Sequence, residues 1–216
     1  MQAVIFDMDG LMFDTERLMI AAWDYAGEKA GLGKAGYMVY RTLGTNRQRT
    51  RQLWQEEFGQ RYCEETIRHY TREYQHRYYA QYGVPVKPGL YALLSYLQEA
   101  GYPMAIASSS DREVVHRHLE SAQVESYFSV VVTGDQVTQS KPEPDIFLAA
   151  CRQLGLRPEA CYVLEDSRAG LWAAYRAGCR PLMVPDLWQP DGETAAILAG
   201  KFSDLTQVIP YLEENR

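Results

Sequence analysis

The sequence has few of the features that mark secreted or disulfide-rich proteins. Its 216 residues include only four cysteines, and no two of them form a C-x-x-C pair. The cysteines therefore give no sign of a disulfide framework. We expect free, buried thiols in a reducing compartment; the cysteines are Cys63, Cys151, Cys161 and Cys179.

Long apolar runs and an excess of positive charge are also absent. No stretch approaches the roughly 18 apolar residues of a membrane-spanning helix, and no basic segment precedes the first apolar run, so we expect no signal peptide. The formal net charge of −6 disfavours nucleic acid as a partner, because nucleic-acid binders usually carry a basic stripe. The sequence predicts a cytoplasmic protein without nucleic-acid or membrane partners. Its oligomeric state is open, with a monomer favoured.

Short apolar runs recur along the chain, each followed by a turn or by polar residues. Runs of this length that are apolar throughout are typical of buried parallel strands. Helical patterns lie between most of them, and such alternation predicts an α/β fold with a doubly wound, Rossmann-like parallel sheet. The expected strands are residues 4–6, 104–107, 130–133, 162–164 and 182–184.

One long stretch interrupts this alternation. Residues 15–82 are polar, helical in pattern and rich in tyrosine, arginine and glutamine. The stretch is too long for a single crossover helix. We therefore predict an all-helical cap subdomain, residues 15–83, inserted into a core domain of residues 1–14 and 84–216. Hinges are expected near Asp14 and at residues 83–88.

Two patterns inside the insertion have alternative interpretations. "GLGKAG" at residues 31–36 matches G-x-G-x-x-G, but a dinucleotide site needs a preceding strand. A helical pattern precedes it here, so we expect a loop. Tyr70, Tyr74 and Tyr78 recur at every fourth residue, which favours packing between helices; an aromatic wall facing a substrate is the alternative.

Two pairs of carboxylates come directly after expected strands. "DMDG" places Asp7, Asp9 and Gly10 after the first strand, and "LEDS" places Glu165 and Asp166 at the end of a later one. Ligands of open α/β sheets bind at the carboxyl ends of the strands. If these two strands are neighbours, the four carboxylates converge at one edge of the sheet. Neighbouring like charges need a neutralising cation, and Mg²⁺ prefers oxygen ligands together with a substrate phosphate.

The same carboxylates suggest a reaction. A carboxylate at a strand end can attack phosphorus and form an aspartyl-phosphate, while a second one transfers the proton. We assign these roles to Asp7 and Asp9. Gly10 would let backbone N–H groups approach phosphate oxygens. Capping of the next helix by Asp166 or Ser167 is a structural alternative, and it is compatible with a functional role.

A phosphoryl group also needs donors. "ASSSD" ends the second expected strand, and a hydroxyl with backbone N–H groups at a helix N-terminus binds phosphate. Ser108 is our candidate, with Ser109 beside it. Ser110 and Glu113 fit a helix capping box instead. Lysines are usually solvated, but two prolines follow Lys141 in "SKPEPD" and would aim its side chain at the site.

The ordered set of motifs resembles the haloacid dehalogenase superfamily of hydrolases, in the β-phosphoglucomutase-like branch that carries a helical cap. The family motifs are D-x-D-G-[LV], a Ser or Thr that closes the next core strand, a lysine in a K-P-x-P-D context, and E-D-S-x-x-G. The resemblance covers essentially the whole chain. The matching residues are 7–11, Ser108, Lys141, Glu165, Asp166, Ser167 and Gly170.

This resemblance implies a role for each matching residue. Asp7 is expected to be the nucleophile and a magnesium ligand, and Asp9 the general acid and base, with its backbone carbonyl on the metal. Lys141 is expected to hold phosphoryl oxygens together with Ser108, and to steady Asp7. Asp166 is expected to bind magnesium, with Glu165 as a further ligand or as its support.

The cap is expected to influence the choice of substrate. "LGTNRQRT" resembles a cap loop of the family that often carries an arginine at the position of Arg47. This side chain would bind a second phosphate or a sugar hydroxyl. An exposed arginine at a helix start is the alternative.

The leading hypothesis is a magnesium-dependent phosphatase, a phosphoric monoester hydrolase, for a small phosphorylated metabolite such as a sugar phosphate. A β-phosphoglucomutase-type mutase is the alternative, but such members typically place a histidine where Met19 stands here. A true dehalogenase would lack the second acid, Asp9. A phospho-accepting or binding module without catalysis would need no large cap. None of the four histidines of the chain stands at the position of Met19; they are His69, His76, His116 and His118.

Overall fold

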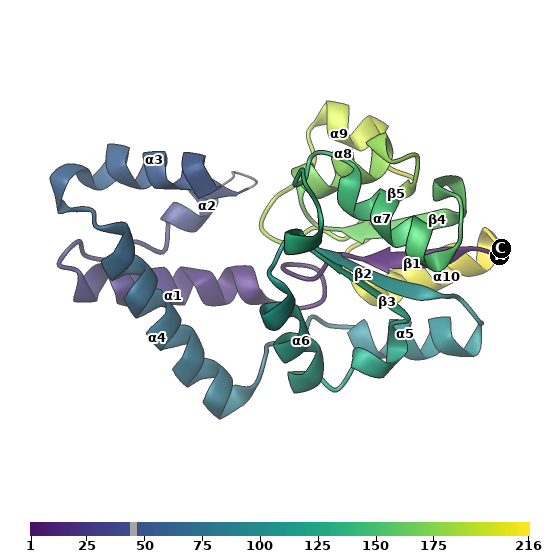
Figure 1. The fold of residues 1–216 in the computed structure, drawn as a ribbon, viewed down its shortest axis with the longest axis horizontal. Coiled ribbons are helices and arrows are strands. Elements are labelled where there is room, and N and C mark those ends of the chain that lie inside the picture. The colour runs from purple at the N-terminus through teal and green to yellow at the C-terminus, as the bar shows by residue number, and fades with distance from the viewer. Residues whose placement is uncertain (44–46) are drawn as a thin grey trace. The chain divides into compact units, whose positions relative to one another are not determined.

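The computed structural model describes residues 1–43 and 47–216. The chain divides into two compact units (Figure 1). The first unit combines Met1–Phe13 with Val86–Arg216, and the second unit is Asp14–Pro85. In the part of the chain that is described, no helix combines the length and the apolar character needed to cross a membrane.

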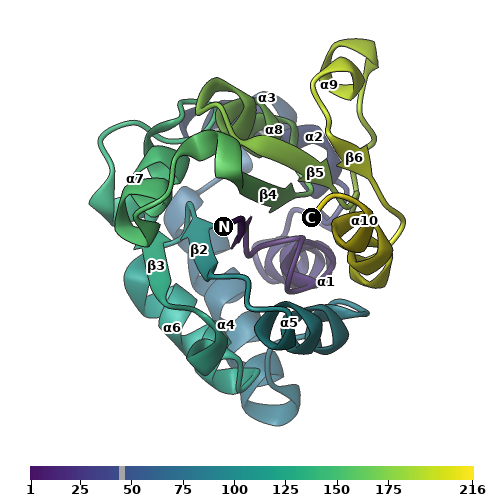
Figure 2. The same ribbon diagram turned by 90° about the vertical axis from the view of Figure 1, so that its right-hand side faces the viewer.

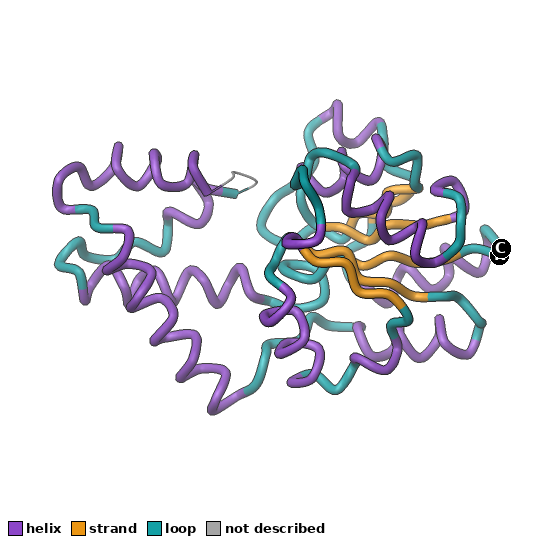
Figure 3. Tube along the Cα trace, viewed as in Figure 1, coloured by secondary structure: helices purple, strands orange, loops and turns teal. Residues whose placement is uncertain are grey.

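The first unit is built on one parallel sheet of six strands, in the order β3-β2-β1-β4-β5-β6. The strands are drawn in orange in Figure 3. The chain winds outward from β1 in one direction and then from β4 in the other, which confirms the predicted doubly wound sheet. The carboxyl end of β1 is therefore the switch point, where α/β proteins bind ligands. The strands are β1 (Ala3–Phe6), β2 (Met104–Ser108), β3 (Val130–Thr133), β4 (Cys161–Glu165), β5 (Arg180–Met183) and β6 (Gly200–Lys201).

Helices cover both faces of this sheet (Figure 2). On one face α7 packs against β2 and β3, while α8 packs against β4 and β5. On the opposite face lie α5, α6 and α10 (Figures 1 and 2). The helices of this unit are α5 (Leu90–Glu99), α6 (Arg112–Ser121), α7 (Asp145–Leu154), α8 (Arg168–Arg176), α9 (Gly192–Ala196) and α10 (Val208–Glu214).

Buried aliphatic side chains hold the central strands rigidly. Ile5 of β1 and Val163 of β4 are fully buried in one cluster with Phe147 of α7. Burying an aliphatic side chain of this size contributes roughly 1.5–3 kcal/mol. Because every residue of β1 and β4 is buried, the polar residues that follow these strands begin from a fixed backbone.

Three details of the sequence prediction are wrong. The edge strand β6 was not predicted, because two residues carry no apolar run. Ser110 forms no capping box with Glu113: the N-cap of α6 is Asp111, without a side-chain cap bond, and the Ser110 hydroxyl bonds to another carboxylate. Cys63 is exposed, whereas the other three cysteines are buried free thiols as expected.

Among the described residues of the second unit, the regular secondary structure is helical throughout, as predicted. Its core is aromatic: the Trp54 ring stacks on Tyr62, with 5.5 Å between ring centroids, and meets the edge of Trp23 at 5.1 Å. Met38 and Ile67 close the cluster. The helices are α1 (Thr15–Lys29), α2 (Met38–Thr42), α3 (Arg47–Phe58) and α4 (Glu64–Tyr82).

The glycine-rich pattern of this unit is a loop between α1 and α2, as predicted. The Gly36 N–H donates to Asp24 at 2.7 Å. A Cβ at Gly36 would lie 2.4 Å from the Ile20 carbonyl oxygen. Since a helix and not a strand precedes the pattern, the dinucleotide interpretation does not apply.

The tyrosine stripe of α4 packs between helices over part of its length. The Tyr70 and Tyr74 rings lie 6.3 and 5.6 Å from the Tyr25 ring of α1, centroid to centroid. Tyr78 instead contacts Tyr82 of its own helix. The packing interpretation is therefore correct for the first two tyrosines.

Candidate active site

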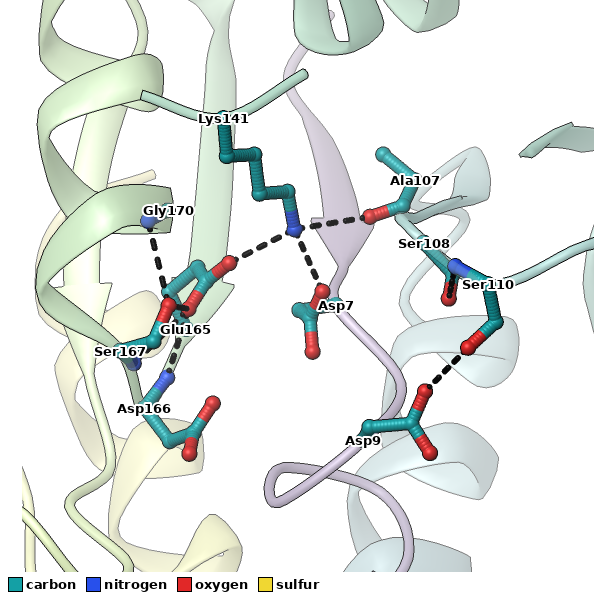
Figure 4. A network of polar contacts seen from close by, with 10 residues as sticks. All are labelled: Asp7, Asp9, Ala107, Ser108, Ser110, Lys141, Glu165, Asp166, Ser167 and Gly170. Atoms are coloured by element: carbon teal, nitrogen blue, oxygen red, sulfur yellow. Dashed lines mark hydrogen bonds and ion pairs between the residues drawn. The ribbon is translucent and has the colours of Figure 1, made fainter. Parts of the chain in front are cut away.

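Polar residues end the three central strands at the switch point. Asp7 directly follows β1, Ser108 closes β2 and Glu165 closes β4. Because β1 pairs with both β2 and β4, these side chains meet at one edge of the sheet. Lys141 reaches the same place from the segment before α7 (Figure 4).

The Lys141 ammonium is saturated by acceptors of this site. Its Nζ donates to Asp7 Oδ1 at 2.5 Å, to Glu165 Oε1 at 2.7 Å and to the Ala107 carbonyl at 3.1 Å. An ammonium has three protons, so each proton has a partner. The Lys141 and Asp7 side chains are only 7% and 10% exposed. The lysine is thus a buried part of the site rather than a solvated surface residue.

Glu165 holds this lysine in place. Its Oε2 accepts from the Asp166 and Ser167 N–H groups and from the Ser167 hydroxyl, at 2.9–3.0 Å, and its Oε1 faces Lys141. A Cβ at Gly170 would lie 1.6 Å from Glu165 Oε1, so only glycine fits there. Ser167 also caps α8 through the Gly170 N–H. The capping alternative is correct for Ser167 and not for Asp166.

The site carries more negative charge than its lysine balances. Burial raises the pKa of Asp7 to about 8; Lys141 opposes this shift, while Glu165 and Asp9 add to it. Burial alone would lower the pKa of Lys141, but Asp7 and Glu165 raise it above its ordinary value. One ammonium shared by two carboxylates leaves the site short of positive charge, which a divalent cation would supply.

The residues fit a magnesium ion. Carboxylate oxygens of Asp7, Glu165 and Asp166 lie within 4.8 Å of one another. Gly10 has a φ of +82°, and a Cβ there would lie 2.3 Å from Asp166 Oδ2, so this glycine makes room for the carboxylate. Few carboxylates and only oxygen donors are what Mg²⁺ prefers. Because both Glu165 oxygens already accept hydrogen bonds, Asp7 and Asp166 are the better candidates as ligands.

The metal-free protein is expected to lose stability as pH rises from about 4 to 8. In this window folded Asp7 retains a proton that the unfolded chain has released, because its pKa rises from 3.8 to about 8. The slope should reach at most about 1.4 kcal/mol per pH unit. Urea unfolding in chelator at several pH values measures it. Asp7→Asn should flatten the slope; an unchanged slope in this variant would contradict the assignment.

Asp9 and the serines lie on the other side of Asp7. Asp9 Oδ2 accepts from the Ser110 hydroxyl at 2.7 Å, and the Ser110 N–H donates to Ser108 Oγ at 3.1 Å (Figure 4). Ser108 is buried, and Ser109 is exposed. Sequence reasoning missed the contact between Ser110 and Asp9; the available signal was the run of three serines at a strand end.

A buried histidine was also missed. His118 of α6 packs edge-on against the Phe13 ring, with 5.7 Å between centroids. Burial lowers the pKa of His118, and the negative charge of Asp9 opposes this shift. The histidine therefore favours its neutral form beside the site.

One predicted residue cannot be compared with this arrangement. Arg47 is the first residue of α3, in the second unit, and its side chain lies outside the described residues. The remaining predicted residues all lie at the carboxyl edge of the sheet: Asp7, Asp9, Gly10, Ser108, Ser109, Lys141, Glu165 and Asp166.

A model of the family described as haloacid dehalogenase-like hydrolase matches residues 4–184. The chain belongs to this family. The hydrolase is 31% identical over 178 residues to a Thermotoga maritima "Phosphorylated carbohydrates phosphatase", with 82% of each chain covered. These findings confirm the predicted family and the predicted enzyme class, phosphoric monoester hydrolase.

Solved structures share the fold of the hydrolase over nearly its whole length. One is a Thermotoga maritima protein provisionally named a β-phosphoglucomutase, with 28% identity, a TM-score of 0.82 and 99% of each chain covered. Another is CbbY from Rhodobacter sphaeroides in complex with phosphate, with 25% identity, a TM-score of 0.78 and 96% of each chain covered.

Proposed function

We propose that the chain is a magnesium-dependent phosphatase that hydrolyses a small phosphorylated metabolite through an aspartyl-phosphate. A sugar phosphate is the substrate class that we favour. One observation carries the proposal: Lys141 joins Asp7 to Glu165 beside Asp166, at the switch point of the sheet. The relative named a phosphorylated carbohydrates phosphatase supports the choice of substrate class.

In the proposed mechanism Asp7 attacks phosphorus while Asp9 gives its proton to the departing substrate oxygen. Water then attacks phosphorus, Asp9 takes a proton from it, and the bond to Asp7 breaks to release inorganic phosphate. Ser108 and the backbone N–H of Ser109 hold the phosphoryl oxygens, and Lys141 joins them by exchanging its longest contact, to the Ala107 carbonyl, for a phosphoryl oxygen. The Gly10 N–H is not a donor here, because it already donates to the Phe13 carbonyl at 2.9 Å.

Asp7, Asp166 and the Asp9 backbone carbonyl would hold the magnesium ion. When bound, the ion neutralises the carboxylates and draws in the phosphate dianion. Glu165 was predicted as a ligand or a support; we propose the supporting role, since it orients Lys141 and its oxygens already accept hydrogen bonds.

The second unit is proposed to be the cap, residues 15–83, and to select the substrate, with Arg47 as the candidate contact to a second phosphate or a sugar hydroxyl. We further propose that the enzyme works as a monomer in the cytoplasm, where buried free thiols such as Cys151 and Cys179 remain reduced.

A mutase activity is the second candidate, because one structural relative bears a β-phosphoglucomutase name. Against it stands Met19 in α1, at the position where the mutases typically carry a histidine. Incubation with β-glucose 1-phosphate and catalytic glucose 1,6-bisphosphate distinguishes the two. If glucose 6-phosphate forms faster than inorganic phosphate, the protein is a mutase and the phosphatase proposal is wrong.

Removal of divalent metal is expected to abolish phosphate release without unfolding the protein. A panel of phosphorylated metabolites, assayed for inorganic phosphate with magnesium or with excess chelator, measures this. Adding magnesium back should restore the rate, and Asp166→Ala should raise the magnesium concentration that is needed. An unchanged rate in chelator would contradict the proposed metal dependence.

A further inference from the structure

Ser110, in the loop after β2, is held through all three of its polar groups. Its N–H donates to Ser108 Oγ at 3.1 Å, and its hydroxyl donates to Asp9 Oδ2 at 2.7 Å (Figure 4). Its carbonyl accepts from the Gly134 N–H at 3.1 Å. The backbone is thus bound on both sides, and the hydroxyl is aimed at a carboxylate that follows the neighbouring strand.

Close contact with the end of β3 fixes this loop. Gly134 comes directly after β3, and a Cβ there would lie 2.3 Å from the Ser109 carbonyl oxygen. Only glycine permits this approach, which brings the Gly134 N–H to the Ser110 carbonyl. The place of Ser110 is therefore set by the strand framework, and Asp111 rather than Ser110 serves as the N-cap of α6.

We infer that Ser110 is a positioning residue for Asp9, an inference that rests on the proposed function. A general acid and base must keep its orientation while its charge changes. A hydroxyl suits this task because it donates to a carboxylate and accepts from a carboxylic acid.

The same residue orients the phosphate site. Since Ser108 Oγ accepts from the Ser110 N–H, the single proton of the Ser108 hydroxyl remains available for a phosphoryl oxygen. Ser110 thus links the group that transfers protons to a group that holds the substrate phosphate.

The test uses two substrates that differ in their need for an acid. An alkyl phosphate must have its leaving oxygen protonated, whereas p-nitrophenolate leaves without help. Ser110→Ala should lower kcat/KM for glucose 6-phosphate by about 30-fold, and that for p-nitrophenyl phosphate by less than about threefold. Ser110→Thr, which keeps the hydroxyl, should remain within about threefold of wild type on both substrates.

Ser129→Ala is the matched control, because its hydroxyl donates to the Met104 carbonyl at the opposite end of β2. It should leave both rates unchanged. Equal losses on the two substrates in Ser110→Ala, no loss at all, or a Thr variant as slow as the Ala variant would each overturn the inference.

A structural measurement separates this inference from the proposed function. If the wild type hydrolyses neither ester, the proposed function fails. Crystal structures of the wild type and of Ser110→Ala then test the contact by itself. A reoriented Asp9 side chain in the variant supports positioning by Ser110, and an unchanged Asp9 overturns it.

Discussion

Asp7→Asn is expected to reduce phosphate release by at least about 10⁴-fold, because an amide cannot form the aspartyl-phosphate. The carboxylate lies 2.5 Å from the Lys141 ammonium and follows the fully buried strand β1. The change is nearly isosteric, and Lys141 keeps Glu165 and the Ala107 carbonyl as partners. Loss of activity should therefore occur in a folded protein.

The measurement combines steady-state release of inorganic phosphate with circular dichroism. Labelled phosphate should be trapped on the wild type after acid quenching and not on the variant. Asp204→Asn serves as a control of the same chemical type, since Asp204 caps a short helix near the C-terminus. A rate within tenfold of wild type, with contaminating phosphatases excluded, would contradict the role of Asp7.

The central part of the fold follows from patterns within single segments. Strands β1, β2 and β4 are buried on both faces, so their apolar runs are visible in the sequence. The edge strand β6 has only two residues, Gly200 and Lys201, one of them exposed. Its pairing with β5 depends on the neighbouring strand and not on a pattern of its own.

The candidate site likewise has residues that local patterns predict and residues whose roles depend on distant contacts. Asp7 and Asp166 were found because each lies directly after a strand pattern, and Lys141 because its prolines mark a defined backbone. The roles of Glu165 and Ser110 come from hydrogen bonds to residues that are distant in the sequence: Glu165 accepts from Lys141, and Ser110 donates to Asp9. The local sequence around Ser110 fits a helix cap equally well, so it could not reveal the contact with Asp9.

Lys141→Ala is expected to lower kcat by about 10²- to 10³-fold, by comparison with the loss of one preorganised donor at a developing charge. The variant leaves Asp7 and Glu165 without the ammonium that they share. The Asp7 carboxylate, whose pKa burial already raises, would then favour its protonated form further. A protonated nucleophile attacks poorly, so the loss should appear mainly in the chemical step.

Lys201→Ala is the matched control, because this lysine of β6 is exposed and, among the described residues, its side chain bonds only to Gln189. It should leave kcat and KM unchanged. A Lys141→Ala variant in which KM rises while kcat stays the same would show that the lysine only binds substrate. In that case the short contact to Asp7 would serve the fold, and the ionisation of the nucleophile would depend on the bound cation instead.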